Sequence, residues 1–133
     1  MNKLKKNHFY LIETAKKIIN ARFKENRHHF VAAIRTVSGE IYTGIHLRTS
    51  QEKDDVCAEV VALANAFANG EVDIECIVVV NRIGDIMAPC GKCSEIFIEL
   101  CPNAEIILPG IGGGRVALVS QLLPFRKATN PSN

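Results

Sequence analysis

The sequence lacks any apolar stretch long enough to cross a lipid bilayer. Its lysine-containing start is interrupted by Glu13, Lys16 and Lys17, where a signal peptide would need an apolar core. There is no internal repeat, and no window is biased enough in composition to predict long disorder. A membrane-spanning, secreted or largely disordered protein is therefore not expected. With 133 residues, of which 47% are hydrophobic, the chain fits one compact domain. We expect this domain over residues 1–126 and a flexible tail over 127–133.

The cysteines do not form the regular framework of a disulfide-stabilised secreted domain, because they are five in number and three of them have metal-ligand spacing. Thiols stay reduced in the cytoplasm, so cysteines without a disulfide pattern predict that the protein is cytoplasmic. The net charge is only +2. Residues 1–30 are rich in lysine and arginine, but a charged run on a surface helix is usually a solvated face. The sequence therefore predicts a cytoplasmic protein that binds neither nucleic acid nor a membrane.

Hydrophobic periodicity predicts helices that alternate with strands. Helices are expected at 8–23, 56–69 and 90–100. Strands are expected at 30–37, 40–47, 74–80, 104–108 and 116–119. The first two strands form a hairpin, and the polar segment after it is expected to end in a helix N-cap near Asp55. The predicted fold class is therefore α/β, a three-layer α-β-α sandwich around a mixed five-stranded sheet.

Two short cysteine motifs carry the clearest chemical signal, Cys57-Ala58-Glu59 and Pro89-Cys90-Gly91-Lys92-Cys93. Three thiolates can hold Zn²⁺ and leave its fourth tetrahedral position to water, which distinguishes catalytic from structural zinc. Glu59, two residues after the first cysteine, is then the natural proton carrier for that water. All three cysteines are expected in the first turns of two helices, whose N-termini stabilise thiolates and lower their pKa.

Two simpler interpretations remain beside this one. The cysteines could be buried core thiols, since free cysteine is commonly a core residue. The zinc could also be structural, with Cys76 or Cys101 as a fourth ligand. Cys101, however, follows Cys93 by about 12 Å along the helix at ~1.5 Å per residue, and Cys76 sits in a buried strand. The Pro-Cys-x-x-Cys spacing at a helix start argues against core thiols, and a structural zinc site does not explain Glu59.

The two motifs match the signature of zinc-dependent nucleobase deaminases, and nearly the whole chain resembles the cytidine deaminase family, in particular its blasticidin S deaminase-like members. The matching segments, in chain order, are Ala32-Ala33, Gly39-Glu40-Ile41-Tyr42-Thr43-Gly44, Cys57-Ala58-Glu59-Val60-Val61-Ala62-Leu63, Pro89-Cys90-Gly91-Lys92-Cys93 and Leu122-Leu123-Pro124. Lys92 and Val60 resemble the blasticidin S type, because tetrameric cytidine deaminases usually have arginine at the position of Val60.

The resemblance implies one zinc ion per chain on Cys57, Cys90 and Cys93, with Glu59 as proton shuttle. It implies a homotetramer, and hydrolytic attack on C4 of the cytosine ring of a free nucleoside or analogue, such as cytidine, deoxycytidine or blasticidin S, with release of ammonia. Two alternatives stay open. The chain could be a non-catalytic zinc-containing binding protein of the same fold, or a deaminase of another aminated heterocycle.

The substrate-binding positions depart from the family pattern. Where cytidine deaminases hold the ribose with asparagine and glutamate, this sequence has His46 and Arg48. The resemblance also places Ala58 at the substrate, and His28 where the family packs a phenylalanine on the base. We hypothesise that the ligand carries an anionic or acceptor group near Arg48. The alternative is that Arg48 pairs with an acid of the following loop, Glu52, Asp54 or Asp55.

Overall fold

The computed structural model describes residues 2–23 and 28–123. The predicted tail, 127–133, and the predicted domain boundary at residue 126 lie outside this part of the chain. Three helices are described: α1 (Lys6–Arg22), α2 (Ala58–Ala68) and α3 (Gly91–Leu100). The strands are β1 (Asn2–Lys3), β2 (Phe30–Thr36), β3 (Ile41–Ile45), β4 (Ile74–Asn81), β5 (Ile86–Met87), β6 (Glu105–Leu108) and β7 (Arg115–Leu118). Short 3-10 turns occupy Glu52–Asp54, Ile111–Gly113 and Val119–Gln121.

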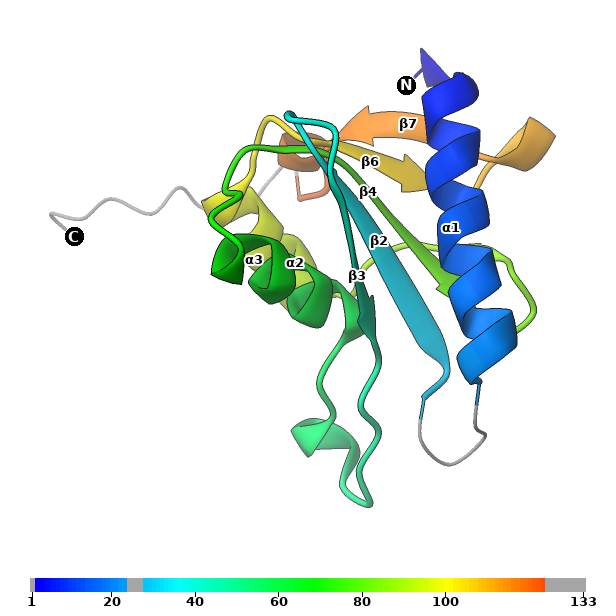
Figure 1. The fold of residues 1–133 in the computed structure, drawn as a ribbon, viewed down its shortest axis with the longest axis vertical. Coiled ribbons are helices and arrows are strands. Elements are labelled where there is room, and N and C mark those ends of the chain that lie inside the picture. Colours follow the sequence, from blue (N-terminus) through cyan, green and yellow to red (C-terminus); the bar gives the residue numbers. More distant parts are fainter. Residues whose placement is uncertain (1, 24–27, 124–133) are drawn as a thin grey trace, which may run out of the picture.

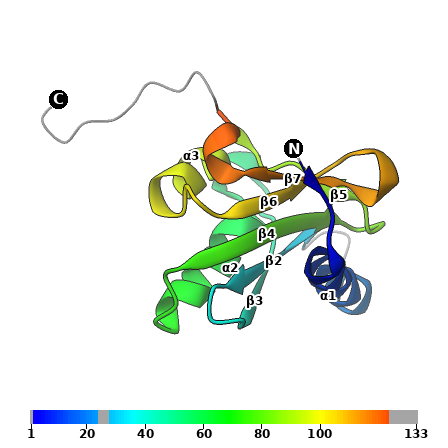
Figure 2. The same cartoon turned by 90° about the horizontal axis from the view of Figure 1, so that it is seen from above.

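The strands form one mixed sheet between two layers of helices. Its order is β1-β7-β6-β4-β2-β3, and β5 pairs with β4. Of the strands in the described part of the chain, only β4 and β6 pair in parallel, and their connection contains α3. Helix α1 covers one face of the sheet, while α2 and α3 lie on the other (Figures 1 and 2). The predicted α-β-α sandwich is confirmed.

The expected number of strands was too low. All five predicted strands are present, and β1 and β5 bring the described sheet to seven. Each of these additional strands has only two residues. Two residues are too few to show the alternating pattern from which strands are predicted, so their pairing with β7 and β4 was not visible in the sequence.

Each face of the sheet has its own hydrophobic core. Leu11, Ala15 and Ile19 of α1 pack on one face. Ala62 of α2 and Phe97 of α3 belong to the core on the other. Strand β4 supplies side chains to both cores in alternation, which explains its continuous apolar sequence. Among the described residues, no helix is both long and apolar enough to span a membrane.

Gly44 of β3 lets helix α2 pack directly against the sheet. A Cβ atom built there would lie 2.3 Å from the backbone N of Ala62 and 2.5 Å from the carbonyl O of Ala58. These are backbone atoms, which cannot move aside as the end of a side chain can. The absence of a side chain at Gly44 therefore sets the position of α2, the helix that follows Cys57 and carries Glu59.

We therefore expect Gly44→Ala to lower the free energy of unfolding by at least the upper end of the ~1–3 kcal/mol range of overpacked cores. Denaturant unfolding measures it. Gly91→Ala is the matched control, because a Cβ in that first helical turn meets nothing within 4 Å. Equal stability of the two variants would contradict the direct packing of α2 on β3.

Candidate metal centre and substrate pocket

The three motif cysteines lie at the N-terminal ends of α2 and α3. Cys57 is the N-cap of α2, with extended backbone, and Cys90 is the N-cap of α3. Cys93 lies in the first turn of α3, as predicted, and its backbone N–H donates to Cys90 Sγ at 3.4 Å. The sequence placed the N-cap of α2 two residues too early, at Asp55, and placed Cys57 and Cys90 inside their helices. In the structure, both cysteines are instead the N-cap residues of these helices.

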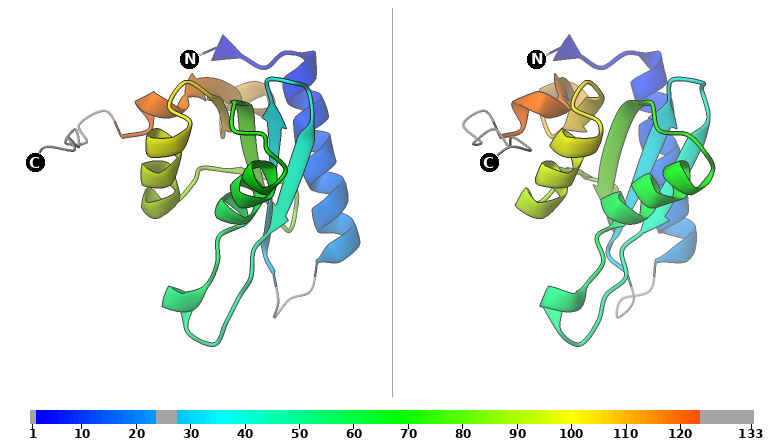
Figure 3. Two further views of the ribbon diagram at one scale, coloured as in Figure 1. Left: turned by 60° about the vertical axis from the view of Figure 1, so that its left-hand side comes forward. Right: turned by 90° about the vertical axis from the view of Figure 1, so that its left-hand side faces the viewer.

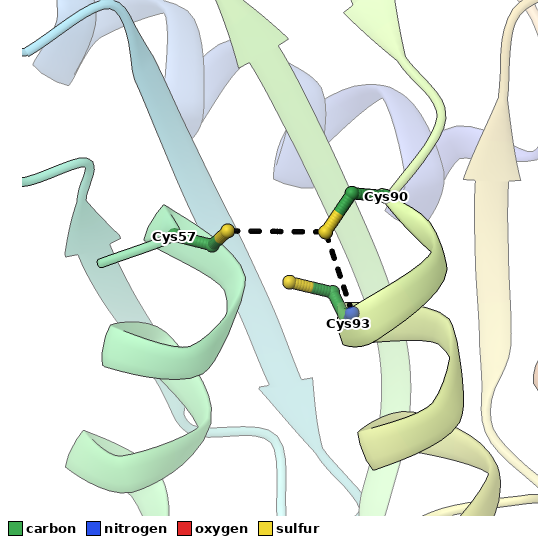
Figure 4. A group of neighbouring side chains, drawn as sticks. All are labelled: Cys57, Cys90 and Cys93. Carbon is green, nitrogen blue, oxygen red and sulfur yellow. Dashed lines mark hydrogen bonds between the residues drawn. The ribbon is translucent and has the colours of Figure 1, made fainter. Parts of the chain in front are cut away.

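The sulfur atoms of Cys57, Cys90 and Cys93 converge on one point between the two helices (Figure 4). They all lie within 4.8 Å of one another, and Cys57 Sγ and Cys90 Sγ are 3.9 Å apart. Tetrahedral zinc with Zn–S bonds of ~2.3 Å separates its sulfurs by about 3.8 Å. The donor set and its spacing therefore fit zinc. The two other cysteines lie elsewhere: Cys76 is buried in the α1 core, and Cys101 is the C-cap of α3.

Burial governs the protonation of these thiols in the protein itself. Burial, followed by the charge of Glu59 and the neighbouring thiols, raises the pKa of Cys93 far above its ordinary value. Burial is likewise the largest cause that raises the pKa of Cys57. For the protein groups alone, burial therefore outweighs the lowering of these pKa values that we expected from the helix N-termini. A dication between the sulfurs reverses this balance, because a coordinated thiol is deprotonated.

A small cavity of about 160 Å³ lies beside the sulfurs, and we call it the reaction cavity. Its lining includes Cys57 and Cys90, the predicted site residues Ala58, Glu59 and His46, and also Phe30, Val79, Met87 and Ala88. Glu59 is only 6% exposed. Its charge is close enough to raise the pKa of Cys57 and Cys93, so its carboxylate lies beside the metal position. An acid in the first turn also suits the helix dipole, but that role would not require burial.

His46 has both ring nitrogens engaged. Its Nε2 lies 3.1 Å from Asp55 Oδ2, and its Nδ1 accepts from the backbone N–H of His29 at 3.4 Å. Asp55 also accepts from the Thr49 N–H at 2.6 Å, and this bond is the largest cause that lowers the Asp55 pKa. Because a carboxylate cannot donate, His46 donates from Nε2, and the ring presents its apolar face to Phe30 with ring centres 5.4 Å apart.

Arg48 lies outside the reaction cavity, in a neighbouring chamber that we call the antechamber. This chamber has a volume of about 480 Å³ and shares Phe30 and His46 with the reaction cavity. Its other lining residues are His29, Arg48, Thr49, Ser50, Glu52 and Asp55. Arg48 Nη1 donates to His29 Nε2 at 2.7 Å. Within residues 2–23 and 28–123, Arg48 makes no ion pair, and so the predicted alternative partners Glu52, Asp54 and Asp55 do not bind it.

His28 is the one predicted substrate-binding residue that the structure does not bring to either chamber. It lies next to Phe23, and its Nε2 contacts the carbonyl O of Arg22. Phe30, two residues along, lines both chambers instead. The aromatic side chain that lines the cavity is therefore Phe30, and not His28 as the resemblance implied. Side chains alternate along a strand, so a shift of two keeps the same face and is hard to detect from sequence.

A second group with metal-ligand atoms, His8, Cys76 and Glu105, lies on the opposite face of the sheet. His8 Nδ1 accepts from the Lys5 N–H at 2.8 Å, and Nε2 lies 2.9 Å from Glu105 Oε1. The ring therefore carries its proton on Nε2, where a metal would need a lone pair. Burial raises the pKa of the Cys76 thiol to about 12, which keeps it protonated. The group therefore has a structural role, in which the His8–Glu105 hydrogen bond joins α1 to the sheet.

Comparison with known proteins decides between the interpretations of the cysteine site. The family model described as the cytidine and deoxycytidylate deaminase zinc-binding region matches residues 5–108. The chain belongs to the cytidine and deoxycytidylate deaminase family. Membership in this family identifies the cofactor as zinc and the protein as a zinc-dependent hydrolytic deaminase of the cytosine ring. The predicted family and activity are thereby confirmed.

Individual relatives agree with this deaminase assignment. The chain is 30% identical to a blasticidin-S deaminase from Bacillus cereus over 128 residues, which cover 90% of this chain and 91% of that protein. It is 32% identical to a cytidine deaminase from Halalkalibacterium halodurans, over 70% of this chain and 72% of that one. Among solved structures, a cytidine deaminase from Burkholderia pseudomallei matches with a TM-score of 0.74 at 31% identity, over 89% of this chain and 97% of that one.

Proposed function

We propose that this deaminase acts on a free cytosine nucleoside or nucleoside analogue, with Cys57, Cys90 and Cys93 as zinc ligands and Glu59 as proton carrier. The observation that carries the proposal is the shared cavity, because two of the cysteines and the buried Glu59 line the same 160 Å³ of space. A complete ligand usually fills ~300–1,000 Å³. The reaction cavity therefore suits a single ring, and the rest of the substrate extends into the antechamber.

The chemistry assigned to the chain itself is proton transfer. Zinc, when bound, supplies the Lewis acidity that makes water a nucleophile near neutral pH. Glu59 takes the proton from the water that attacks C4 and returns it to ring N3. In the second half of the reaction it carries the proton of the new C4 hydroxyl to the amine, which leaves C4 as ammonia while the carbonyl of the uracil product forms. The low exposure of Glu59 keeps this proton from bulk water.

The walls of the reaction cavity position the ring. Phe30 and the apolar face of His46 lie 5.4 Å apart between ring centres on one side, and Val79 and Met87 add apolar surface. Such surfaces favour a flat aromatic ring. The limited volume disfavours a purine. This argument supports cytosine over another aminated heterocycle, and Glu59 argues against a non-catalytic binding protein.

A substrate panel tests this proposal. Zinc-loaded protein is incubated with cytidine, deoxycytidine, blasticidin S and 2-aminopurine riboside, and ammonia release gives kcat/KM for each. We expect turnover of cytosine compounds and at least tenfold less for the aminopurine. Equal or faster release from the aminopurine would favour a deaminase of another heterocycle.

We also infer from the family resemblance a homotetramer in the cytoplasm. Sedimentation equilibrium measures the assembly directly, and we expect four times the chain mass of 14.6 kDa. A single 14.6 kDa species at micromolar concentration would contradict the tetramer.

A further inference from the structure

The antechamber contains a cation, Arg48, that forms no ion pair with an acid among residues 2–23 and 28–123. Arg48 is exposed to the chamber, and its guanidinium has five N–H donors. The bond that the structure shows for these donors goes to His29, a neutral acceptor in this arrangement. Among the described residues no carboxylate lies within ion-pair distance of Arg48. The remaining donors are available to a ligand.

His29 fixes the position of this guanidinium. Its Nε2 accepts from Arg48 at 2.7 Å, so the neutral ring carries its proton on Nδ1. The ring of His29 packs edge-on against Phe23, with ring centres 5.8 Å apart, and its backbone N–H holds His46. The backbone and ring of His29 are therefore both anchored, and Arg48 is kept at the chamber wall instead of turning toward Glu52.

The acids of the antechamber limit the charge that a ligand can bring. Both oxygens of Asp55 are already used, Oδ1 by Thr49 and Oδ2 by His46. Glu52 also lines the chamber. A single negative charge can pair with Arg48, whereas a dianion would be repelled by Glu52 and Asp55. A carboxylate has the planar geometry that matches the guanidinium fork.

The geometry of the pyrimidine ring places the substrate group. C4 and N1 lie opposite each other across the six-membered ring. If C4 faces the metal position, the N1 substituent points away from the cysteines, toward Phe30 and His46, which are shared with the antechamber. His46 has no free ring nitrogen for it, since Asp55 and His29 use both. Arg48 is then the side chain that binds the substituent.

We propose that His29 is a specificity-determining residue that holds Arg48 over the antechamber, so that the enzyme prefers cytosine nucleosides with a carboxylate on the N1 substituent. The inference rests on the proposed deaminase function. His29 acts through Arg48 and is therefore a positioning residue, and Arg48 is the group that contacts the carboxylate.

Two matched substrates test the proposal, cytidine 5′-carboxylate and cytidine 5′-carboxamide, which differ in charge and hardly in size. For zinc-loaded wild type we expect kcat/KM to be about tenfold higher for the carboxylate than for the carboxamide. One charge-assisted hydrogen bond from Arg48 is strong enough for a difference of this size. His29→Phe keeps a packed ring but removes the acceptor. It should reduce the preference to below about twofold, because the loss of kcat/KM falls mainly on the carboxylate and not equally on both substrates.

Three further variants separate positioning from general damage. Arg48→Gln should lose the preference as His29→Phe does. His29→Gln, which offers an amide oxygen to Arg48, should restore part of it. His28→Phe changes the neighbouring histidine, which lines neither chamber, and should keep the wild-type ratio.

Several results would overturn the inference about His29. These are a wild-type ratio near one, equal loss for both substrates in His29→Phe, or the same loss of preference in His28→Phe. A stronger preference for cytidine 5′-monophosphate than for the carboxylate would overturn the limit to a single charge. Failure of the proposed function is distinguishable, since then no cytosine compound, cytidine included, releases ammonia.

Discussion

Glu59→Gln is expected to leave zinc in place and to reduce kcat for ammonia release by about 10²–10⁴-fold, the range that general acid–base groups contribute. The amide has nearly the shape of the carboxylate but cannot take a proton from water. Glu59 lines the reaction cavity at 6% exposure, so no bulk water replaces it easily as a base. Steady-state ammonia release and zinc content of the same sample measure both parts of the prediction.

Glu95 on α3 is the matched control for this change. Glu95→Gln also replaces a helical glutamate, but that residue lies in the middle of α3 and does not line the reaction cavity. It should keep kcat within about twofold. If Glu59→Gln retains more than a tenth of the wild-type kcat, Glu59 is not the proton carrier.

Cys90→Ala is expected to remove the bound zinc and with it all measurable turnover. Two remaining thiolates leave the metal without the three protein ligands of a catalytic zinc site. Cys90 Sγ also accepts the N–H of Cys93 and lies 3.9 Å from Cys57 Sγ, so its loss opens the whole cluster. Zinc per chain, measured by elemental analysis after dialysis, should fall from about one to near zero.

Cys101→Ala tests whether this loss is specific to the motif. Cys101 is on the same helix as Cys93 but at its C-cap, and burial raises the pKa of its thiol to about 11. It should keep one zinc per chain. Equal zinc loss in both variants would point to general unfolding, and retained zinc in Cys90→Ala would exclude Cys90 as a ligand.

The protruding loop after β3 shows why the site could be only partly predicted. Residues 47–56 extend away from the sandwich (Figure 3) and are closed at the base by paired backbone bonds of 2.9 Å between Leu47 and Val56. The His46–Asp55 bond crosses the same base. This closure joins residues nine apart in an irregular segment, for which no periodic pattern exists. The sequence therefore identified His46 and Arg48 as unusual but could not supply their partners.

Local chemistry made the metal site predictable. The ligand spacing of Cys57, Cys90 and Cys93, with Glu59 two residues after the first, limits the possible arrangements far more than hydrophobic patterns do. The helices and longer strands could be predicted from hydrophobic periodicity, because burial repeats regularly along them. Phe30 was missed in favour of His28, since only packing against His46 shows which of them reaches the cavity.

The central claim is that the chain releases ammonia from a cytosine ring by hydrolysis. Zinc-loaded wild type incubated with cytosine nucleosides in ¹⁸O-labelled water tests it most directly, with ammonia and the pyrimidine product quantified together. We predict one ammonia per uracil-type product, with the label at C4. The claim would be contradicted if protein with one zinc per chain bound these compounds, released no ammonia and returned them unchanged, as a non-catalytic binding protein would.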